Sequence, residues 1–240
     1  MTKAALVCLL LAACGGSKTP LAVDYGDGTG SLVGKTIILN GVALGAISDF
    51  PDAVGGTRFA ESGSTELSAA GATSDQTFVV AYLDPDTTQQ GVFYGRSDAP
   101  ALPTTSGATL TGDYAGYVYS ARDGGYTRQI TGDVLAELDF GTSTIDLTIS
   151  GRQCLCAGVT PGNIVFTGLT WDESARFAGA GTAGTTDFSD GGFASTATPQ
   201  VQGLIGNDGT EVVGAVEYTQ TTFDGAVLIT YREVGGFIAD

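Results

Sequence analysis

From residue 36 onward, short segments in which apolar residues alternate with polar or small ones are separated by turn-forming clusters. A period of two is typical of strands that bury one face, and residues 144–150 show it because Ile145, Leu147 and Ile149 would share one side. No amphipathic helix of normal length is visible, so the pattern predicts an all-β protein. The predicted strands are residues 36–44, 77–83, 91–95, 108–120, 132–140, 144–150, 163–170, 176–183, 191–196, 201–205, 211–218 and 226–232.

Glycine is abundant both between and inside these segments. The sequence holds 37 glycines, and clusters such as residues 121–125 and 206–209 favour turns. Glycine inside a strand lowers stability unless a bulge or a close backbone approach requires it, and residues 177–181 contain two such glycines. Strands at this spacing are typical of an up-and-down barrel or a two-layer sandwich. Residues 97–107, with two prolines and several small polar residues, form the best candidate domain boundary.

The N-terminus has the pattern of an export signal. Lys3 precedes an apolar run over residues 4–13, which is too short to span a bilayer and ends in small residues. Residues 11–14, Leu-Ala-Ala-Cys, resemble the bacterial lipobox, in which the cysteine is acylated, for example with palmitate, and becomes the first mature residue. A plain secretory signal that happens to contain a cysteine is the alternative interpretation.

Acylation of Cys14 would hold the protein on a membrane, because acyl chains contribute about 0.8 kcal/mol per buried CH₂. Position 15 is Gly rather than the Asp that resembles an inner-membrane retention signal, which favours the outer membrane of a Gram-negative cell. We therefore predict a lipoprotein signal peptide at residues 1–13, a tether at 14–20, and a lipid-anchored protein of the cell outer membrane facing either the surface or the periplasm.

Composition excludes several classes of function. The chain has 26 acidic and 10 basic residues, a net charge of −16, which argues against a nucleic-acid partner. It contains no histidine, which removes the usual general base, the usual zinc ligand and a common haem ligand. We therefore predict that the protein is not an enzyme, with no catalytic residue, no metal ligand and no cofactor. An enzyme that uses carboxylates alone is the alternative.

Two loop motifs are candidate ligand sites. Residues 29–36 nearly match a phosphate-binding loop, but the first required glycine is Thr29 and the segment leads into a β-branched run instead of a helix. Residues 24–30 carry two carboxylates whose spacing matches no calcium loop, and the acidic turns at residues 84–86 and 187–190 lead to the same interpretation. All are predicted to be solvated turns.

Cys154 and Cys156 are the two cysteines left after the signal and the lipidated Cys14. In an oxidising compartment we predict that they form a small local disulfide. A redox-active pair, an intermolecular bridge and unpaired thiols are the alternatives.

Several aromatic residues could contribute to a ligand surface. Most aromatics of a barrel fill its core or rim, so none is singled out as a binding residue and the ligand-binding residues remain unknown. The candidates are Tyr114, Tyr117, Tyr119, Trp171 and Phe177.

Four segments resemble transferrin-binding protein B-like surface lipoproteins. Residues 102–112 are similar to the entry to that family's barrel, and residues 137–145 to its acidic-Phe-Gly hairpin. Residues 201–214 resemble its Gly-aromatic-Tyr-Gly segment, with Ile205 in place of the Tyr and Asn207 in place of the usual proline, and the terminal residues 235–240 also fit the family.

The resemblance implies an eight-stranded antiparallel β-barrel at residues 102–240, preceded by a small irregular β handle region at residues 21–101. It also implies a non-enzymatic lipoprotein that binds a host or environmental protein or a solute, in iron or solute acquisition. The alternative function is a structural or protective envelope lipoprotein with no small ligand.

Overall fold

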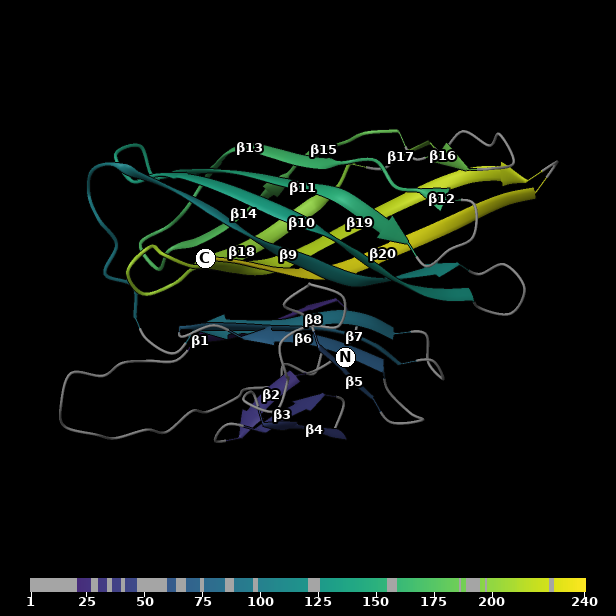
Figure 1. The fold of residues 1–240 in the computed structure, drawn as a ribbon, viewed down its shortest axis with the longest axis horizontal. Coiled ribbons are helices and arrows are strands. Elements are labelled where there is room, and N and C mark those ends of the chain that lie inside the picture. The colour runs from purple at the N-terminus through teal and green to yellow at the C-terminus, as the bar shows by residue number, and fades with distance from the viewer. Residues whose placement is uncertain are drawn as a thin grey trace, which may run out of the picture.

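The computed structural model describes residues 21–26, 30–33, 36–39, 42–46, 60–63, 68–73, 76–84, 89–96, 99–120, 126–154, 159–185, 187–188, 195–196, 198–224 and 227–240. Within these ranges every regular element is a β-strand, which confirms the all-β prediction. The strands form a large barrel-like sheet, a five-stranded sheet, a three-stranded sheet and a two-stranded ladder (Figure 1).

The second half of the chain builds the barrel. Its antiparallel sheet follows the order β14-β18-β19-β20-β9-β10-β11-β13-β15, with the short β17 (Ser195–Thr196) against β19. The bounds are β9 Gly107–Ser120, β10 Tyr126–Asp139, β11 Thr144–Cys154, β13 Ile164–Thr170, β14 Arg176–Ala180, β15 Thr182–Ala183, β18 Gln200–Ile205, β19 Val212–Asp224 and β20 Val227–Ala239.

The segment containing β14 and β15 brings the two ends of this sheet together. Only Gly181 separates the two strands, yet β14 pairs with β18 while β15 pairs with β13. A bridge between Trp171 and Phe177 adds a second link between the β13 and β14 ends. The sheet is therefore nearly closed into a barrel, not split into a sandwich. If β14 and β15 are counted as one interrupted strand, the strand order of the barrel sheet contains the eight strands that the resemblance implies.

Strand β11 follows the predicted alternation. Ile145, Leu147 and Ile149 are fully buried in the barrel core, whereas Asp146 between them is exposed. Strand β20 departs from it, because the predicted strand ended at residue 232 and the observed one continues to Ala239. All of its last seven residues are buried, so no polar side remains to reveal the period of two.

The handle region forms the other two main sheets. The five-stranded sheet has the order β1-β8-β7-β6-β5, and the three-stranded sheet has the order β2-β3-β4. The bounds are β1 Leu21–Gly26, β2 Gly30–Val33, β3 Thr36–Leu39, β4 Val42–Ala46, β5 Ala60–Gly63, β6 Ser68–Thr73, β7 Thr77–Asp84 and β8 Gln89–Arg96. The remaining ladder pairs β12 (Val159–Thr160) with β16 (Asp187–Phe188).

The single strand predicted at residues 36–44 is wrong in one respect. It comprises two antiparallel strands, β3 and β4, in which Leu39 pairs with Val42. The two residues between them in the sequence are Asn-Gly, the dipeptide that most strongly favours a two-residue hairpin. Apolar residues on both sides of this dipeptide led to the prediction of one continuous strand.

The five-stranded sheet packs on the outer wall of the barrel. Ala81, Val92 and Tyr94 of the sheet share a buried apolar cluster with Val234 and Ile238 of the barrel. Figure 1 shows β7 and β8 lying beneath β9 and β20. Because inward residues of the same strands fill the barrel core, residues 114–118 of β9 and 233–239 of β20 are buried on both faces.

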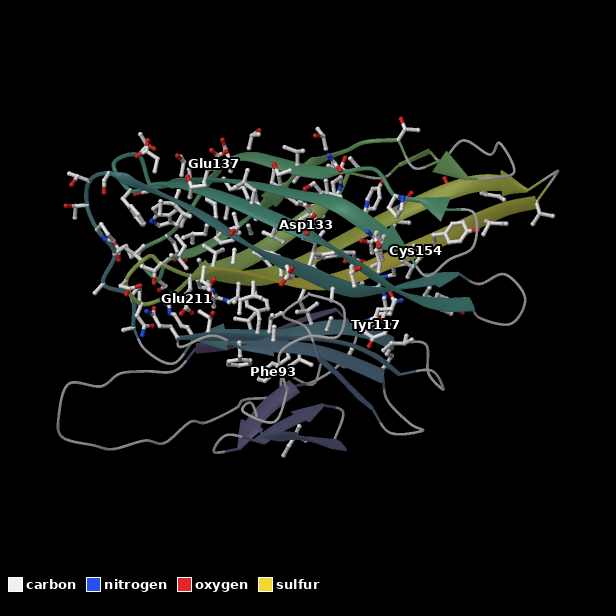
Figure 2. All side chains as sticks on the ribbon, viewed as in Figure 1. Phe93, Tyr117, Asp133, Glu137, Cys154 and Glu211 are labelled. Atoms are coloured by element: carbon white, nitrogen blue, oxygen red, sulfur yellow. The ribbon has the colours of Figure 1, made fainter. Side chains whose placement is uncertain are left out.

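Polar contacts fix the sheet to one end of the barrel. The buried Arg96 of β8 donates from Nη1 to the Ile205 carbonyl at 2.8 Å and from Nη2 to the Ser174 carbonyl at 2.6 Å. Thr77 Oγ1 donates to Glu211 Oε2 at 2.8 Å, and Glu211 lies at the junction of sheet and barrel in Figure 2. These contacts hold the barrel turns against the sheet.

The close approach of β9 to β20 explains one of the glycines inside strands. Gly116 and Gly235 are directly opposite each other. A Cβ built on Gly116 would lie 2.5 Å from the Gly235 Cα and 2.6 Å from the Val234 oxygen. Backbone atoms cannot move aside as a flexible side chain can, so glycine is required at this crossing.

Candidate binding surface

The described interior of the barrel is packed with side chains. Tyr114, Phe166, Phe177 and Phe237 lie inside it, each at most 3% exposed. An eight-stranded barrel is just wide enough for its own side chains to fill. The surfaces that a ligand can reach are therefore on the outside of the barrel and at its ends.

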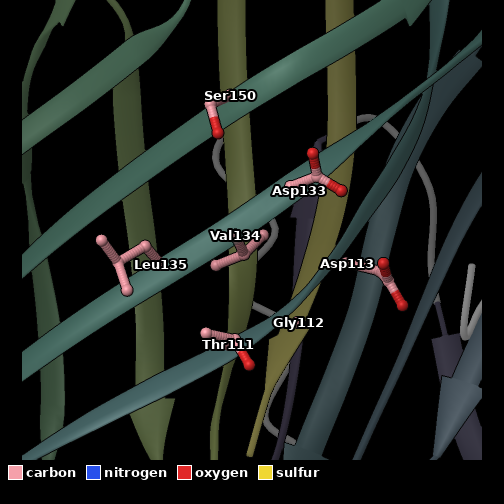
Figure 3. Close-up of a pocket in the computed structure, with 7 residues that line it drawn as sticks. All are labelled: Thr111, Gly112, Asp113, Asp133, Val134, Leu135 and Ser150. Atoms are coloured by element: carbon pink, nitrogen blue, oxygen red, sulfur yellow. The ribbon is translucent and has the colours of Figure 1, made fainter.

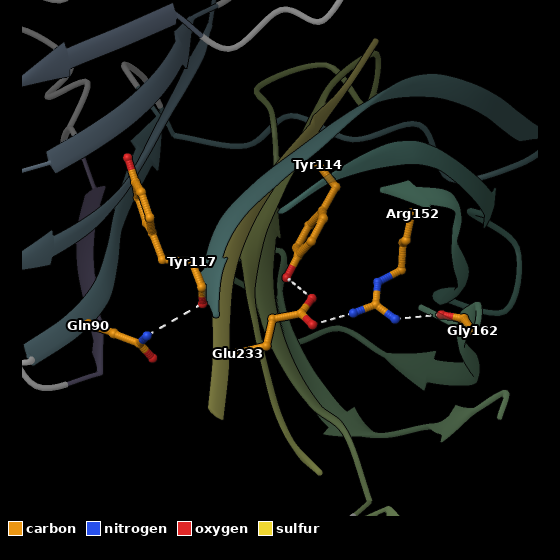
Figure 4. A network of polar contacts seen from close by, with 6 residues as sticks. All are labelled: Gln90, Tyr114, Tyr117, Arg152, Gly162 and Glu233. Carbon is orange, nitrogen blue, oxygen red and sulfur yellow. Dashed lines mark hydrogen bonds and ion pairs between the residues drawn. The ribbon is translucent and has the colours of Figure 1, made fainter. Parts of the chain in front are cut away.

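A polar network crosses this interior (Figure 4). Tyr114 of β9 donates its hydroxyl to Glu233 Oε1 of β20 at 2.7 Å, and the other Glu233 oxygen forms an ion pair with Arg152 of β11. Arg152 also donates to the Gly162 carbonyl and lies 5.8 Å from the centroid of the Tyr218 ring. The charged side chains of Arg152 and Glu233 are 0% and 2% exposed, so the pair is isolated from water.

Burial and mutual contact shift the pKa values of two members of this network. Burial raises the pKa of Tyr114 well above its usual range, and the Glu233 carboxylate raises it further. Burial alone would lower the pKa of Arg152, but Glu233 and Tyr114 outweigh that effect and raise it. Arg152 stays a cation and Tyr114 a hydrogen-bond donor at physiological pH. The network therefore ties β9, β11 and β20 together.

One groove lies on the outer wall of the barrel (Figure 3). Its volume is about 410 Å³, and Asp113 of β9 and Asp133 of β10 stand directly opposite each other in it. Ser150 of β11 continues the row, because it pairs with Asp133. Like charges on opposite residues of neighbouring strands repel each other, which makes this surface attractive to cations. The other lining residues are Thr111, Gly112, Val134 and Leu135.

A second groove lies at the end of the barrel where the handle region connects, the left end in Figure 1. Its volume is about 390 Å³, and three segments far apart in the sequence line it. They are the connection between β8 and β9, the β10–β11 turn and the β13–β14 turn. The lining residues are Pro100, Leu102, Pro103, Thr104, Phe140, Ser143, Trp171, Asp172 and Glu173. We call this the turn-end groove.

Main-chain hydrogen bonds hold the three segments of the turn-end groove together. Phe140 N donates to the Ser106 oxygen at 3.0 Å, and Trp171 N donates to the Ser143 oxygen at 3.3 Å. The Phe140 and Trp171 rings meet edge to face with their centroids 5.9 Å apart. The groove is therefore built before any ligand arrives, as is typical of specific binding sites.

The rim of the turn-end groove is acidic. Asp172 Oδ1 accepts hydrogen bonds from Ser174 N at 2.8 Å and from Arg176 N at 3.0 Å, so this carboxylate shapes the turn. Glu173 is exposed, and it has no ion-pair or hydrogen-bond partner within the part of the chain that the structure describes. Its charge is available to a ligand.

The five aromatic candidates lie in different environments of the structure. Tyr114 and Phe177 belong to the barrel core, and Tyr117 lies between the barrel and the five-stranded sheet (Figure 2). Tyr119 is half-buried on β9 and lines neither groove. Trp171 alone among the five lines a groove. Sequence reasoning missed Phe140, although the Asp-Phe-Gly that contains it was noted for its resemblance to a hairpin.

Only one of the two cysteines predicted to pair lies within the described residues. Cys154 is disulfide-bonded, but Cys156 lies outside the described ranges, so their mutual pairing stays a prediction. Cys14, the signal peptide and the tether also lie outside them.

The described residues contain no cluster of three or more Cys, Asp or Glu side chains able to hold a metal ion. Nor do they contain a helix with the length and apolarity needed to cross a membrane.

Sequence comparison finds no matching family model and no matching curated protein. Structure comparison does find relatives. A single-residue mutant of the vaccine antigen transferrin binding protein B from Haemophilus parasuis Hp5 matches with a TM-score of 0.51 at 12% identity. The isotype 1 transferrin binding protein B from serogroup B Neisseria meningitidis matches with a TM-score of 0.53 at 14% identity.

The chain has a transferrin-binding-protein-B-like fold. The likeness covers 92% of this chain in both comparisons, so it includes strands of the handle region as well as the barrel. The chain spans less than half of each relative, 45% and 43% respectively. The resemblance predicted from four short segments is therefore confirmed at the level of the fold.

Proposed function

We propose that the protein is a non-enzymatic lipoprotein of the outer membrane that binds a protein ligand at the cell surface. The observation that carries this proposal is the likeness of its fold to two proteins named for transferrin binding. The two grooves support it, because each combines a fixed main-chain frame with exposed carboxylates. A packed interior also favours contact with a macromolecule over enclosure of a solute.

The anchor and the domain division belong to this proposal. Acylated Cys14 would hold the protein at the membrane, and residues 14–20 would form a tether to the handle region at 21–101 and the barrel at 102–240. Transferrin is one candidate partner, and iron or solute acquisition is the corresponding physiological role. The absence of histidine from the sequence supports a binding role without catalysis.

Capture by intact cells tests the proposal. Cells that express the full-length protein are incubated with labelled transferrin, haemoglobin, haem and the soluble proteins of the organism's surroundings, and bound material is quantified. Cells that express Cys14→Ala provide the control for anchoring. Saturable capture that requires Cys14, together with removal of the domain by external protease, is the expected result. A domain that external protease cannot reach, or no capture of any probe, would favour a structural envelope lipoprotein.

A further inference from the structure

We propose that the turn-end groove binds an extended segment of a partner protein through an arginine or lysine side chain that lies over Trp171. This assignment rests on the proposed function, because its ligand is part of a protein. It deepens that proposal by naming the site and the chemistry of the partner.

The shape of the groove favours an extended segment. Its volume of about 390 Å³ accommodates a few side chains, and it opens to solvent between three turns. Pro103 and Thr104 on one side of the lining are exposed. Small-molecule sites usually enclose most of the ligand surface, and an open groove of this kind does not.

The apolar floor provides the contact for a long basic side chain. Trp171 is partly exposed, and its edge-to-face contact with the buried Phe140 fixes its ring. Tryptophan is the most favourable aromatic partner for a Lys or Arg cation. Leu102 and Pro103 can pack against the aliphatic stem of the same side chain, because long basic residues bury their stems while the charge stays near water.

The acidic residues of the turn-end groove favour a cationic ligand. Asp172 and Glu173 line the groove, and no basic residue does. The nearby Arg96 is bound to the Ser174 and Ile205 carbonyls, and its charge interacts with Asp172, so Glu173 is the carboxylate of the groove that is left for a ligand. The exposed Arg176 belongs to β14 and does not line the groove. A partner cation over Trp171 would therefore have the Glu173 carboxylate as its counter-charge.

The outer-wall groove is the natural comparison. It also carries two carboxylates, Asp113 and Asp133, but no aromatic side chain lines it. If charge alone attracted the partner, both grooves would bind equally well. If the combination of a tryptophan with a carboxylate is required, only the turn-end groove binds. Asp133→Asn removes the same single charge as Glu173→Gln and is the matched control.

A peptide titration tests the assignment directly. The probe is a capped, labelled peptide in which arginines alternate with leucines, with a counterpart that has glutamates in place of the arginines. Binding to the mature lipoprotein in detergent is followed by anisotropy. Trp171 is the only tryptophan of the chain, so intrinsic fluorescence reports occupation of the groove without a label.

We expect saturable binding of the arginine peptide with a change in Trp171 fluorescence, and no binding of the glutamate peptide. Trp171→Leu should weaken binding at least tenfold, as loss of a central aromatic contact does. Glu173→Gln should weaken it about twofold to fivefold, the range of an exposed ion pair. Asp133→Asn should leave it unchanged. Glu173 is exposed, so its replacement tests the proposal even if Trp171→Leu fails to fold.

Three results would overturn the assignment. The first is equal binding of the two peptides, and the second is equal weakening by Asp133→Asn and Glu173→Gln. The third is that tetramethylammonium displaces the labelled peptide at the same concentration as unlabelled peptide does. That result would indicate a site for small ammonium ions. If cells capture a partner equally well with Trp171→Leu, the proposed function stands and this groove assignment fails. If cells capture nothing, the proposed function fails whatever the peptide shows.

Discussion

Replacement of Arg152 by methionine would break the ion pair inside the barrel while nearly preserving side-chain volume. The Glu233 carboxylate would remain buried at the centre of the barrel, with the Tyr114 hydroxyl as its remaining donor among the described residues. The Gly162 carbonyl would also lose its guanidinium donor, and Tyr218 would lose the cation beside its ring.

The expected cost follows from the burial of both partners. Removal of one member of a buried pair leaves an uncompensated charge and typically costs about 3–5 kcal/mol. For a chain of this size each kcal/mol lowers the melting temperature by roughly 2–4 °C, so Arg152→Met should lower it by about 6–20 °C. The double variant Arg152→Met/Glu233→Leu should recover most of this loss, because no charge is left in the core. The Tyr114 hydroxyl would then lack its acceptor, which leaves a cost of about 1–3 kcal/mol.

These free energies can be measured by chemical denaturation monitored by circular dichroism. Arg176→Met, which replaces an exposed arginine, is the control for loss of a positive charge. The control should change the unfolding midpoint very little. The reasoning is refuted if Arg152→Met unfolds within 1 kcal/mol of the unmodified protein, a threshold that is about a third of the expected minimum. It is also refuted if the double variant is less stable than Arg152→Met.

Three further predictions concern other parts of the fold. Gly116→Ala should destabilise the protein by about 1–3 kcal/mol in denaturant, because its Cβ would overlap the backbone of β20; an unchanged midpoint would contradict this. Burial, followed by the nearby Glu217 carboxylate, raises the pKa of Tyr25 to about 12, so folding stability should fall as the pH rises from about 10 through 12. Absorbance titration should show the pKa of Tyr25 lowered in Glu217→Gln, and an identical curve would count against the contact. Thiol counting after denaturation should find no free thiol at Cys154 or Cys156, whereas a disulfide-linked dimer on a non-reducing gel would show that they pair between chains.

Period-two alternation located β11, which buries one face, over nearly its whole length, but it ended β20 seven residues too early. Strand β11 has a solvated side, and its alternating pattern marked it clearly. Strand β20 lies between the barrel core and the five-stranded sheet, so its last seven residues are all buried and the expected period is lost. Whether a strand has one buried face or two depends on which sheet packs against it. The residues of the strand itself do not reveal that long-range contact.

The turn-end groove could not be predicted for a related reason. Its lining comes from residues 100–104, 140–143 and 171–173, which the pairing of β9, β10, β11 and β13 brings together. The sequence did mark Trp171 as an aromatic candidate, yet Tyr114 and Phe177 carried the same signal and are core residues. Local sequence identifies residues that are able to bind, and tertiary packing decides which of them reach the surface.

The double burial of β9 and β20 has a consequence for any attempt to divide the chain. A barrel cut free at residue 102 would keep its interior, but it would present Ala115, Val234 and Ile238 to water as a continuous apolar strip. Two such fragments would cover their strips by association, so the isolated barrel should self-associate in proportion to its concentration. The handle region thus covers this apolar strip in the intact chain, and we expect the barrel to lose solubility when that cover is removed.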